Sequence, residues 1–307
     1  MTAAAPDAPQ TVSWYRTQSG AELLQRVATL AILSILALAF IVPVIWMVIS
    51  SLKPIQTVFD NSWLPPMTSQ GWPVPIPHPQ YFSNFSDAMT LVPFGTYFKN
   101  TLIVTVFSVA GSVLSSSLVA YSFARLRWPG RDFFFVLVLA TMLLPGIVTF
   151  IPQFIIFSKI GWVDTFLPLI VPTWFGNAFY IFLLRQFYRG IPQELAEAAR
   201  IDGAGEFRIW WQIVMPLARP ALAAVGIFAF TGAWEDYFGP LIYVGGDPNN
   251  WTLQLGLKAF ETAAGGGSPL WNLIMAAGLV VMIPVLVAFF IGQKYFIEGV
   301  TLTGLKG

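Results

Sequence analysis

Residues 185–220 of the chain read RQFYRGIPQELAEAARIDGAGEFRIWWQIVMPLARP, a polar stretch between two apolar ones. Pro192 suits the first turn of a helix, and Glu194 adds negative charge near the positive end of the helix dipole. We expect a short helix from Glu194 to Ile201. It should end at Gly203, because glycine readily adopts the left-handed conformation that closes many helices.

The same stretch predicts a second helix, over about residues 205–215, that stops near Pro216. Two interpretations of the resulting helix-turn-helix are open. A short helix with small side chains on its surface can lie in a groove of another protein, whereas an amphipathic helix can lie on the inner leaflet of a membrane. We expect each to hold in part, with residues 197–203 in the partner and the pair Trp210-Trp211 near the membrane interface.

The composition of the whole chain indicates a membrane protein. Hydrophobic residues make up 56% of the 307 positions and charged residues only 10%, with a mean hydropathy of +0.69. A soluble domain of this length could not hide so much apolar surface. A helix needs about 20 apolar residues to cross the hydrocarbon core. Five uncharged runs reach that length: 27–52, 100–124, 133–158, 165–184 and 262–293. A sixth candidate, which is the fifth span in chain order, is expected from near Pro220 to about Val244.

Six crossings place both termini on one side of the membrane, and the distribution of charge indicates which side. With the N-terminus inside, 12 of the 16 Lys and Arg residues lie in inner segments, so the positive-inside rule favours cytoplasmic termini. The first span is too long for the apolar core of a secretory signal, and we interpret it as a retained helix.

The expected fold is therefore all-α and polytopic, with six transmembrane helices. Its expected segments are a cytoplasmic tail (1–22), a first transmembrane helix (23–50), an extracytoplasmic loop (51–94), a five-helix core (95–296) that includes a cytoplasmic loop (189–216), and a cytoplasmic C-terminal tail (297–307).

Several chemistries are excluded by what the sequence lacks. Cysteine is absent, and His78 is the single histidine, which argues against a thiolate or histidine metal site and against a catalytic triad. The formal net charge of +1 argues against a nucleic-acid partner. No G-x-x-x-x-G-K-[ST] loop is present to hold a nucleotide phosphate.

Small residues gather in the second expected span, where Ala110-Gly111-Ser112 is followed by Ser115-Ser116-Ser117. In lipid, helices associate through close packing of small residues, so this face should contact another helix. Prolines inside several expected spans, such as Pro43, Pro145 and Pro284, should kink them.

Glu235 and Asp236 are the only acidic pair inside an expected span, and Trp234 and Tyr237 flank them. Ionisable groups at membrane depth usually face a cavity or a partner. The pair could form a proton or cation relay, line a pathway beside Trp234 and Tyr237, or lie at the interface beyond an early helix end. The spans hold no further acid or base to extend a relay, so we favour the second and third interpretations.

The polar loop resembles the EAA signature of permease subunits in binding-protein-dependent ABC importers. Met215 stands where that family often has Leu, which is a mild departure. The ordered set is Glu197-Ala198-Ala199, Asp202-Gly203-Ala204, Ile213 and Pro216. Other segments are similar to the carbohydrate, maltose-type branch, so that the resemblance covers most of the chain; they are Ser51-Leu52-Lys53-Pro54, Trp234-Glu235-Asp236-Tyr237-Phe238, 252–257 and 299–307.

This resemblance implies a type I ABC importer permease fold in the cytoplasmic membrane of a bacterium or archaeon. It implies a homologous second permease subunit, two ATP-binding subunits that hold ATP and Mg²⁺, and an extracytoplasmic solute-binding protein that delivers a sugar or sugar derivative. The chain itself would bind no cofactor and hydrolyse no ATP. The loop would contain a coupling helix that the ATPase grips, through Glu194, Glu197, Ala198, Ala199, Asp202, Gly203 and Ala204.

Two other function classes stay open at this point. An ion-gradient-driven secondary carrier would use Glu235 and Asp236. An intramembrane enzyme would need a catalytic set that the sequence does not display. The ordered signature on an inner loop makes the importer permease the preferred hypothesis.

Overall fold

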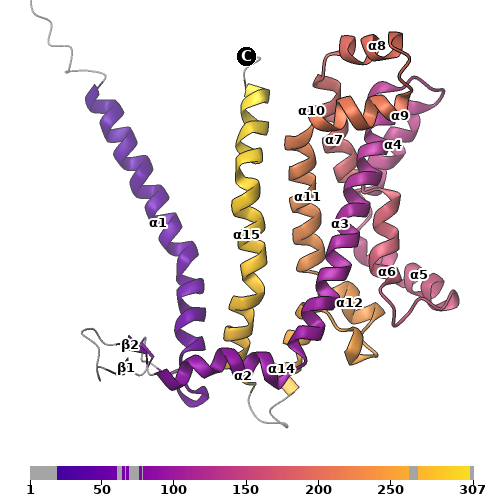
Figure 1. Ribbon diagram of the computed structural model, residues 1–307. Coiled ribbons are helices and arrows are strands. Elements are labelled where there is room, and N and C mark those ends of the chain that lie inside the picture. Colours follow the sequence, from indigo (N-terminus) through magenta and orange to yellow (C-terminus); the bar gives the residue numbers. More distant parts are fainter. Residues whose placement is uncertain are drawn as a thin grey trace, which may run out of the picture.

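The computed structural model describes residues 19–60, 64–65, 67–68, 76–77, 79–262 and 269–304. Long helices lie side by side along a common direction (Figure 1). The start of α1 (Ser19–Ser51), the end of α15 (Trp271–Gly304) and α8 (Gln193–Ile201) lie at one end of the molecule, which we call the α8 end. The expected tails lie outside the described residues at 1–18 and 305–307, and their inner parts continue α1 and α15.

Within the described residues, four helical segments are long and apolar enough to cross a membrane. The number rises to six if each of two bent helix pairs counts as one span. The all-α, multi-span fold expected from the uncharged runs is thus confirmed. The four segments are Gln25–Ser51, Phe94–Arg125, Leu167–Gly190 and Trp271–Gln293.

The third uncharged run does not form one straight crossing, as its length suggested. It divides into α4 (Arg131–Thr141) and α5 (Gly146–Lys159), which meet at 97°. Pro145 explains the break, because a proline disfavours helical geometry in the residue before it and removes a backbone donor. The run therefore turns back on itself or crosses as two pieces.

The fifth span ends earlier than expected, and a sharp bend separates it from the helical segment before it. That segment, Glu206–Leu217, meets α11 (Arg219–Trp234) at 85°, and Pro220 starts α11 in the first-turn position that proline favours. The helix stops at Trp234 instead of continuing to Val244. Shorter elements follow it: α12 (Phe238–Tyr243), η5 (Pro248–Asn250), α13 (Leu253–Leu257) and α14 (Ala259–Thr262).

The fourth span is interrupted near its middle. It consists of α6 (Leu167–Ile170), η3 (Val171–Phe175) and α7 (Ala178–Gly190). Gly176 adopts a φ of 89°, which favours glycine, and the Asn177 side chain then caps α7 by accepting from the backbone N–H groups of the next turn. An interruption at membrane depth needs polar partners for the freed backbone groups.

The serine-rich face of α3 (Phe94–Arg125) supplies those partners. This confirms that the face contacts another helix and adds a reason for its composition, since hydroxyl groups satisfy backbone that the broken span leaves open. The bonds are Ser108 Oγ to the Leu169 carbonyl (3.2 Å), Ser115 Oγ to the Thr173 carbonyl (3.2 Å) and the Asn177 N–H to Ser116 Oγ (3.1 Å).

The expected extracytoplasmic loop contains a helix, α2 (Ser83–Leu91), in its proline-free part. Asn84 of this helix is buried and donates to the carbonyls of Ser51 and Lys53 at 2.8 and 3.1 Å, while Asn272 donates to Asn84. This amide chain ties the end of α1 to the start of α15. The loop also contains η1 (Ile55–Thr57), η2 (Pro79–Phe82) and an antiparallel pair of two-residue strands, β1 (Met67–Thr68) and β2 (Ile76–Pro77).

Candidate functional site

Helix α8 projects from the tip of the α8 end, between α7 and α9 (Glu206–Ile209) (Figure 1). It begins one residue before the expected start, after Pro192. Ala196 is buried and turns toward the helices behind it. The predicted contact residues face outward: Glu194, Glu197, Ala198, Asp202 and Gly203 are exposed, and Ala199 and Ala204 are half-buried.

The turn after α8 has the geometry expected of a glycine cap. Gly203 has a φ of 82°, and the N–H groups of Gly203 and Ala204 donate to the carbonyls of Arg200 (3.0 Å) and Ala199 (2.9 Å). The prediction of a left-handed Gly203 is confirmed. The turn satisfies the last carbonyls of α8 and redirects the chain into α9.

Glu206, at the start of α9, connects the outer helix to the core. Its Oε1 accepts from Arg200 Nε at 2.7 Å, and its Oε2 accepts from the Tyr121 hydroxyl at 2.6 Å. The hydrogen bond between them raises the pKa of the Arg200 guanidinium and lowers the pKa of the Glu206 carboxyl, so both groups remain charged. One carboxylate thus joins α8 to α3, and we call this contact the Glu206 bridge.

Two further contacts fasten the loop to the same helix. Arg125 Nη2 donates to the carbonyls of Tyr188 and Ile191, on the segment that leads into α8. Trp210 lies on the segment that leads away from α8, and its Nε1 donates to Ser117 Oγ of α3 at 2.9 Å. Both arms of the loop are therefore held by α3.

Sequence reasoning missed these anchoring residues, although a signal was present. Ser117, Tyr121 and Arg125 recur every four positions in α3, which places them on one helical face. A hydroxyl, a phenol and a guanidinium on one stripe at the end of an apolar helix indicate a polar partner.

The tryptophan pair divides between two environments, which corrects the expectation that both lie near the membrane interface. The segment Trp210–Val214 is a π-helical turn (η4), followed by α10 (Met215–Leu217). Trp210 is buried in the core, whereas Trp211 is 52% exposed. Only Trp211 is available to lipid or to a partner.

The four candidate pathway residues occupy different surroundings near the end of α11. Trp234 is buried, and its Nε1 donates to the Val281 carbonyl at 3.1 Å. Glu235 is exposed, and Asp236 accepts from the Gly239 N–H at 3.0 Å. The Tyr237 ring lies 6.0 Å from Lys258 Nζ. Asp236 and Tyr237 thus stabilise local structure. The acidic pair Glu235-Asp236 follows the end of α11 instead of interrupting a span.

A cavity of about 340 Å³ lies beside Glu235. Gln254 is the other polar side chain among its lining residues, and Trp234 and Gly278 also line it. Asp236 and Tyr237 are not among them. The apolar lining residues are Leu257, Val281, Met282 and Val285.

Comparison with known proteins identifies the kind of molecule that shares these features. Residues 112–301 match the family described as "Binding-protein-dependent transport system inner membrane component". The matched range includes Ser115 and Ser116 of the serine face of α3, the whole polar loop 185–220 and the end of α11.

Two curated relatives and one solved structure are similar over much of the chain. The arabinooligosaccharides transport system permease protein AraQ of Halalkalibacterium halodurans is 34% identical over 69% of this chain and 74% of its own length. The sn-glycerol-3-phosphate transport system permease protein UgpE of Pectobacterium atrosepticum is 35% identical over 67% of this chain and 73% of its own length.

The solved structure is a crystal structure of a bacterial ABC transporter involved in the import of the acidic polysaccharide alginate. It matches with a TM-score of 0.75 and 26% identity, over 92% of this chain and 99% of the matching chain.

Proposed function

The chain belongs to the family of binding-protein-dependent transport system inner membrane components, and we propose that separate ATPase subunits drive it through α8. As a member of this family it is a multi-pass permease subunit of an ATP-driven ABC importer. An ion-gradient-driven carrier that uses Glu235 and Asp236 finds no support in the family or in the surroundings of these residues.

The observation that carries the proposal is that α8 has an exposed outer face, while the loop that contains it is fastened to α3 on the inner side. Helix α8 presents Ala198 and the turn at Gly203 to solvent, so a groove of another protein can approach its backbone closely. Behind this face, the Glu206 bridge and the Arg125 contacts join both arms of the loop to α3. A displacement of α8 would therefore move α3.

The consequence for transport follows from the packing of α3. Its serine face holds the interrupted part of the fourth span, and the helix also packs against α7 and α11. Packed helices shift as rigid bodies between a few discrete arrangements. We infer that ATP-driven closure of the ATPase pair switches this core between inward-open and outward-open states, by alternating access.

The remaining partners are also part of the proposal. A homologous second permease would supply the other half of the pathway, and an extracytoplasmic solute-binding protein would deliver solute at the end that carries α2. The ATPase subunits would hold ATP and Mg²⁺. Cytoplasmic termini are supported by the 12 inner Lys and Arg residues, and by the position of the start of α1 and the end of α15 at the α8 end.

A sugar or sugar derivative is the proposed substrate class. Support comes from relatives whose names specify arabinooligosaccharides and sn-glycerol-3-phosphate, and from the alginate importer. Glu235 and Gln254 offer hydrogen-bonding groups in the cavity beside α11, which suits a polyhydroxylated solute.

A cross-linking experiment on the assembled importer tests the role of α8. A photoreactive amino acid replaces Ala198, and in a matched variant it replaces Thr90, an exposed position of α2 at the opposite end. Irradiation should join position 198 to an ATPase subunit and should leave position 90 free of it. An intact complex in which position 198 forms no such product would contradict the proposal.

A further inference from the structure

Five arginines surround a pocket of about 230 Å³ at the α8 end of the molecule. The pocket lies between the end of α3, the start of α4, the end of α7 and the inner side of α8. Ala124, Gln193 and Ala196 complete its lining, and the arginines are Arg125, Arg127, Arg131, Arg189 and Arg200. We call this feature the arginine pocket.

Acidic side chains neutralise only part of this positive charge. Arg200 pairs with Glu206 at 2.7 Å, and Arg131 pairs with Asp132 at 3.0 Å. Arg127 makes no hydrogen bond or ion pair with any residue in the described ranges.

The other two arginines leave further donor capacity. Arg189 is likewise without a hydrogen-bond or ion-pair partner among the described residues. Arg125 donates through Nη2 to backbone carbonyls, but its Nε is buried without a partner. Glu194, which is exposed on α8, attracts Arg125 electrostatically without a hydrogen bond or an ion-pair contact. The arginine pocket is therefore an anion-binding environment with unused donors.

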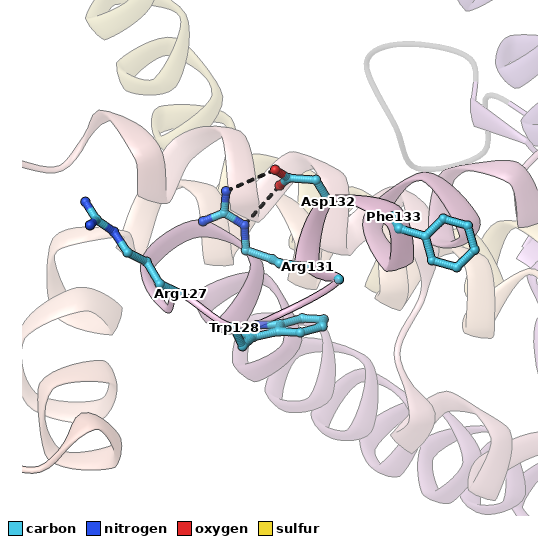
Figure 2. A pocket seen from close by; sticks show the side chains of 6 residues that line it. Arg127, Trp128, Arg131, Asp132 and Phe133 are labelled. Atoms are coloured by element: carbon cyan, nitrogen blue, oxygen red, sulfur yellow. Dashed lines mark hydrogen bonds and ion pairs between the residues drawn. The ribbon is translucent and has the colours of Figure 1, made fainter.

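A second pocket, of about 350 Å³, adjoins the first and shares Arg127 and Arg131 with it. Figure 2 shows Arg131 turned toward Asp132, whereas Arg127 extends away from that pair. Trp128 and Phe133 supply aromatic surface in the same pocket. Tryptophan is enriched at the headgroup level of membranes, where one side of the ring is wet and the other apolar.

Beyond this second pocket, α4 presents an apolar face along its length. Phe133, Val136 and Leu137 are 64%, 61% and 46% exposed, and α4 belongs to a candidate membrane segment. An anionic group held by the arginines would therefore sit directly beside a surface suited to hydrocarbon chains. An acidic protein segment would use the charge but not this apolar continuation.

We propose that the arginine pocket and the adjoining Trp128 pocket bind the headgroup of an anionic phospholipid, with its acyl chains against α4. The phosphate would engage Arg127 and Arg189, which have no hydrogen-bond or ion-pair partner in the part of the chain that the structure describes. Basic pockets between transmembrane helices recognise anionic headgroups in this way. The inference depends on α4 lying in the membrane, and it does not depend on the coupling role of α8.

Native mass spectrometry of the delipidated, assembled importer in detergent tests this site. The complex is titrated separately with phosphatidylglycerol, phosphatidylcholine and inorganic phosphate. The test variant is Arg127→Gln/Arg189→Gln, and the control is Arg208→Gln, an exposed arginine of α9 outside both pockets.

The wild-type complex should bind phosphatidylglycerol more tightly than phosphatidylcholine and bind inorganic phosphate weakly. The double variant should lose about tenfold or more in phosphatidylglycerol affinity, since each basic group near an anionic headgroup adds to the attraction. The control should bind as the wild type does.

Three results would overturn the proposal. Equal binding of the two lipids would show that the arginines do not recognise charge. Tight binding of inorganic phosphate alone would indicate a site for a free anion. Unchanged lipid binding in the double variant, together with loss of the ATPase subunits from the complex, would identify an acidic protein surface as the occupant.

Discussion

Gly203 is the residue whose backbone geometry most constrains the α8 loop. Its φ of 82° is strained for any residue with a Cβ atom, at a cost of about 1–2 kcal/mol. An added Cβ would meet no atom within 4 Å, so the strain comes from the backbone alone. Gly203→Ala should therefore distort the turn and lower ATP-driven uptake severalfold in proteoliposomes.

Gly205 provides the matched control for this prediction. It lies two residues further on, also has open space around its Cβ position, and has an ordinary φ of −72°. Gly205→Ala should retain nearly wild-type uptake and membrane insertion. Equal uptake by the two variants would show that the left-handed turn is not required for coupling.

The Glu206 bridge gives a second prediction at the residue scale. Arg200 and Glu206 are partly exposed, so their ion pair contributes less than about 1 kcal/mol to stability. Its expected role is mechanical. Arg200→Gln and Glu206→Gln should each lower the amount of solute moved per ATP hydrolysed, while thermal stability changes little.

A double-mutant cycle isolates this link. The variant Arg200→Gln/Glu206→Gln should couple no worse than either single variant, because all three lose the same contact. Arg208→Gln, on the same loop but without a hydrogen-bond or ion-pair partner among the described residues, should behave as the wild type. Additive losses would indicate that the two residues act separately.

At the scale of elements, the interrupted fourth span depends on the small-residue face of α3. Trp174 of η3 occupies the space above Gly111, where an added Cβ would come within 2.5 Å of the indole ring. Gly111→Ala should displace η3 and destabilise the folded protein by about 1–3 kcal/mol, as overpacking does. The melting temperature of the purified protein in detergent measures this loss.

Gly95, near the start of the same helix, has no atom within 4 Å of its Cβ position. Gly95→Ala should leave the melting temperature unchanged or raise it slightly, because alanine favours helix. Equal melting temperatures for Gly111→Ala and Gly95→Ala would contradict the close packing of η3 against α3 at Gly111.

The elements also show what could and could not be predicted from the sequence. Short-range signals were sufficient for α8, where Pro192 starts the helix and Gly203 ends it within one residue of expectation. Uncharged runs located the spans but not their bends. The 97° break before Pro145 and the helix end at Trp234 depend on where the freed backbone finds partners, which run lengths do not contain.

The contacts of the site were predictable only in part, for the same reason. Outward-facing residues such as Glu197 and Ala198 carry their signal locally, in an ordered motif. The Glu206 bridge joins residues 85 positions apart. Trp234 stays a predicted pathway residue, since it lines the cavity beside Glu235, but its packing against α15 depends on a neighbour that the sequence does not reveal.

At the scale of the whole molecule, the arrangement of ends predicts a labelling pattern. The chain contains no cysteine, so single-cysteine variants can be made without first replacing native cysteines. Thr90→Cys should react with a membrane-impermeant maleimide in intact cells, whereas Ala198→Cys should react only after permeabilisation. The opposite pattern would reverse the proposed orientation while leaving the family assignment untouched.

The dependence of uptake on the ATPase subunits tests the central claim most directly. Proteoliposomes containing the complete importer, with the solute-binding protein and ATP, should accumulate solute, and removal of the ATPase subunits alone should abolish accumulation even when an ion gradient is imposed. Solute accumulation by the permease subunits without their ATPases, driven by that gradient, would contradict the account.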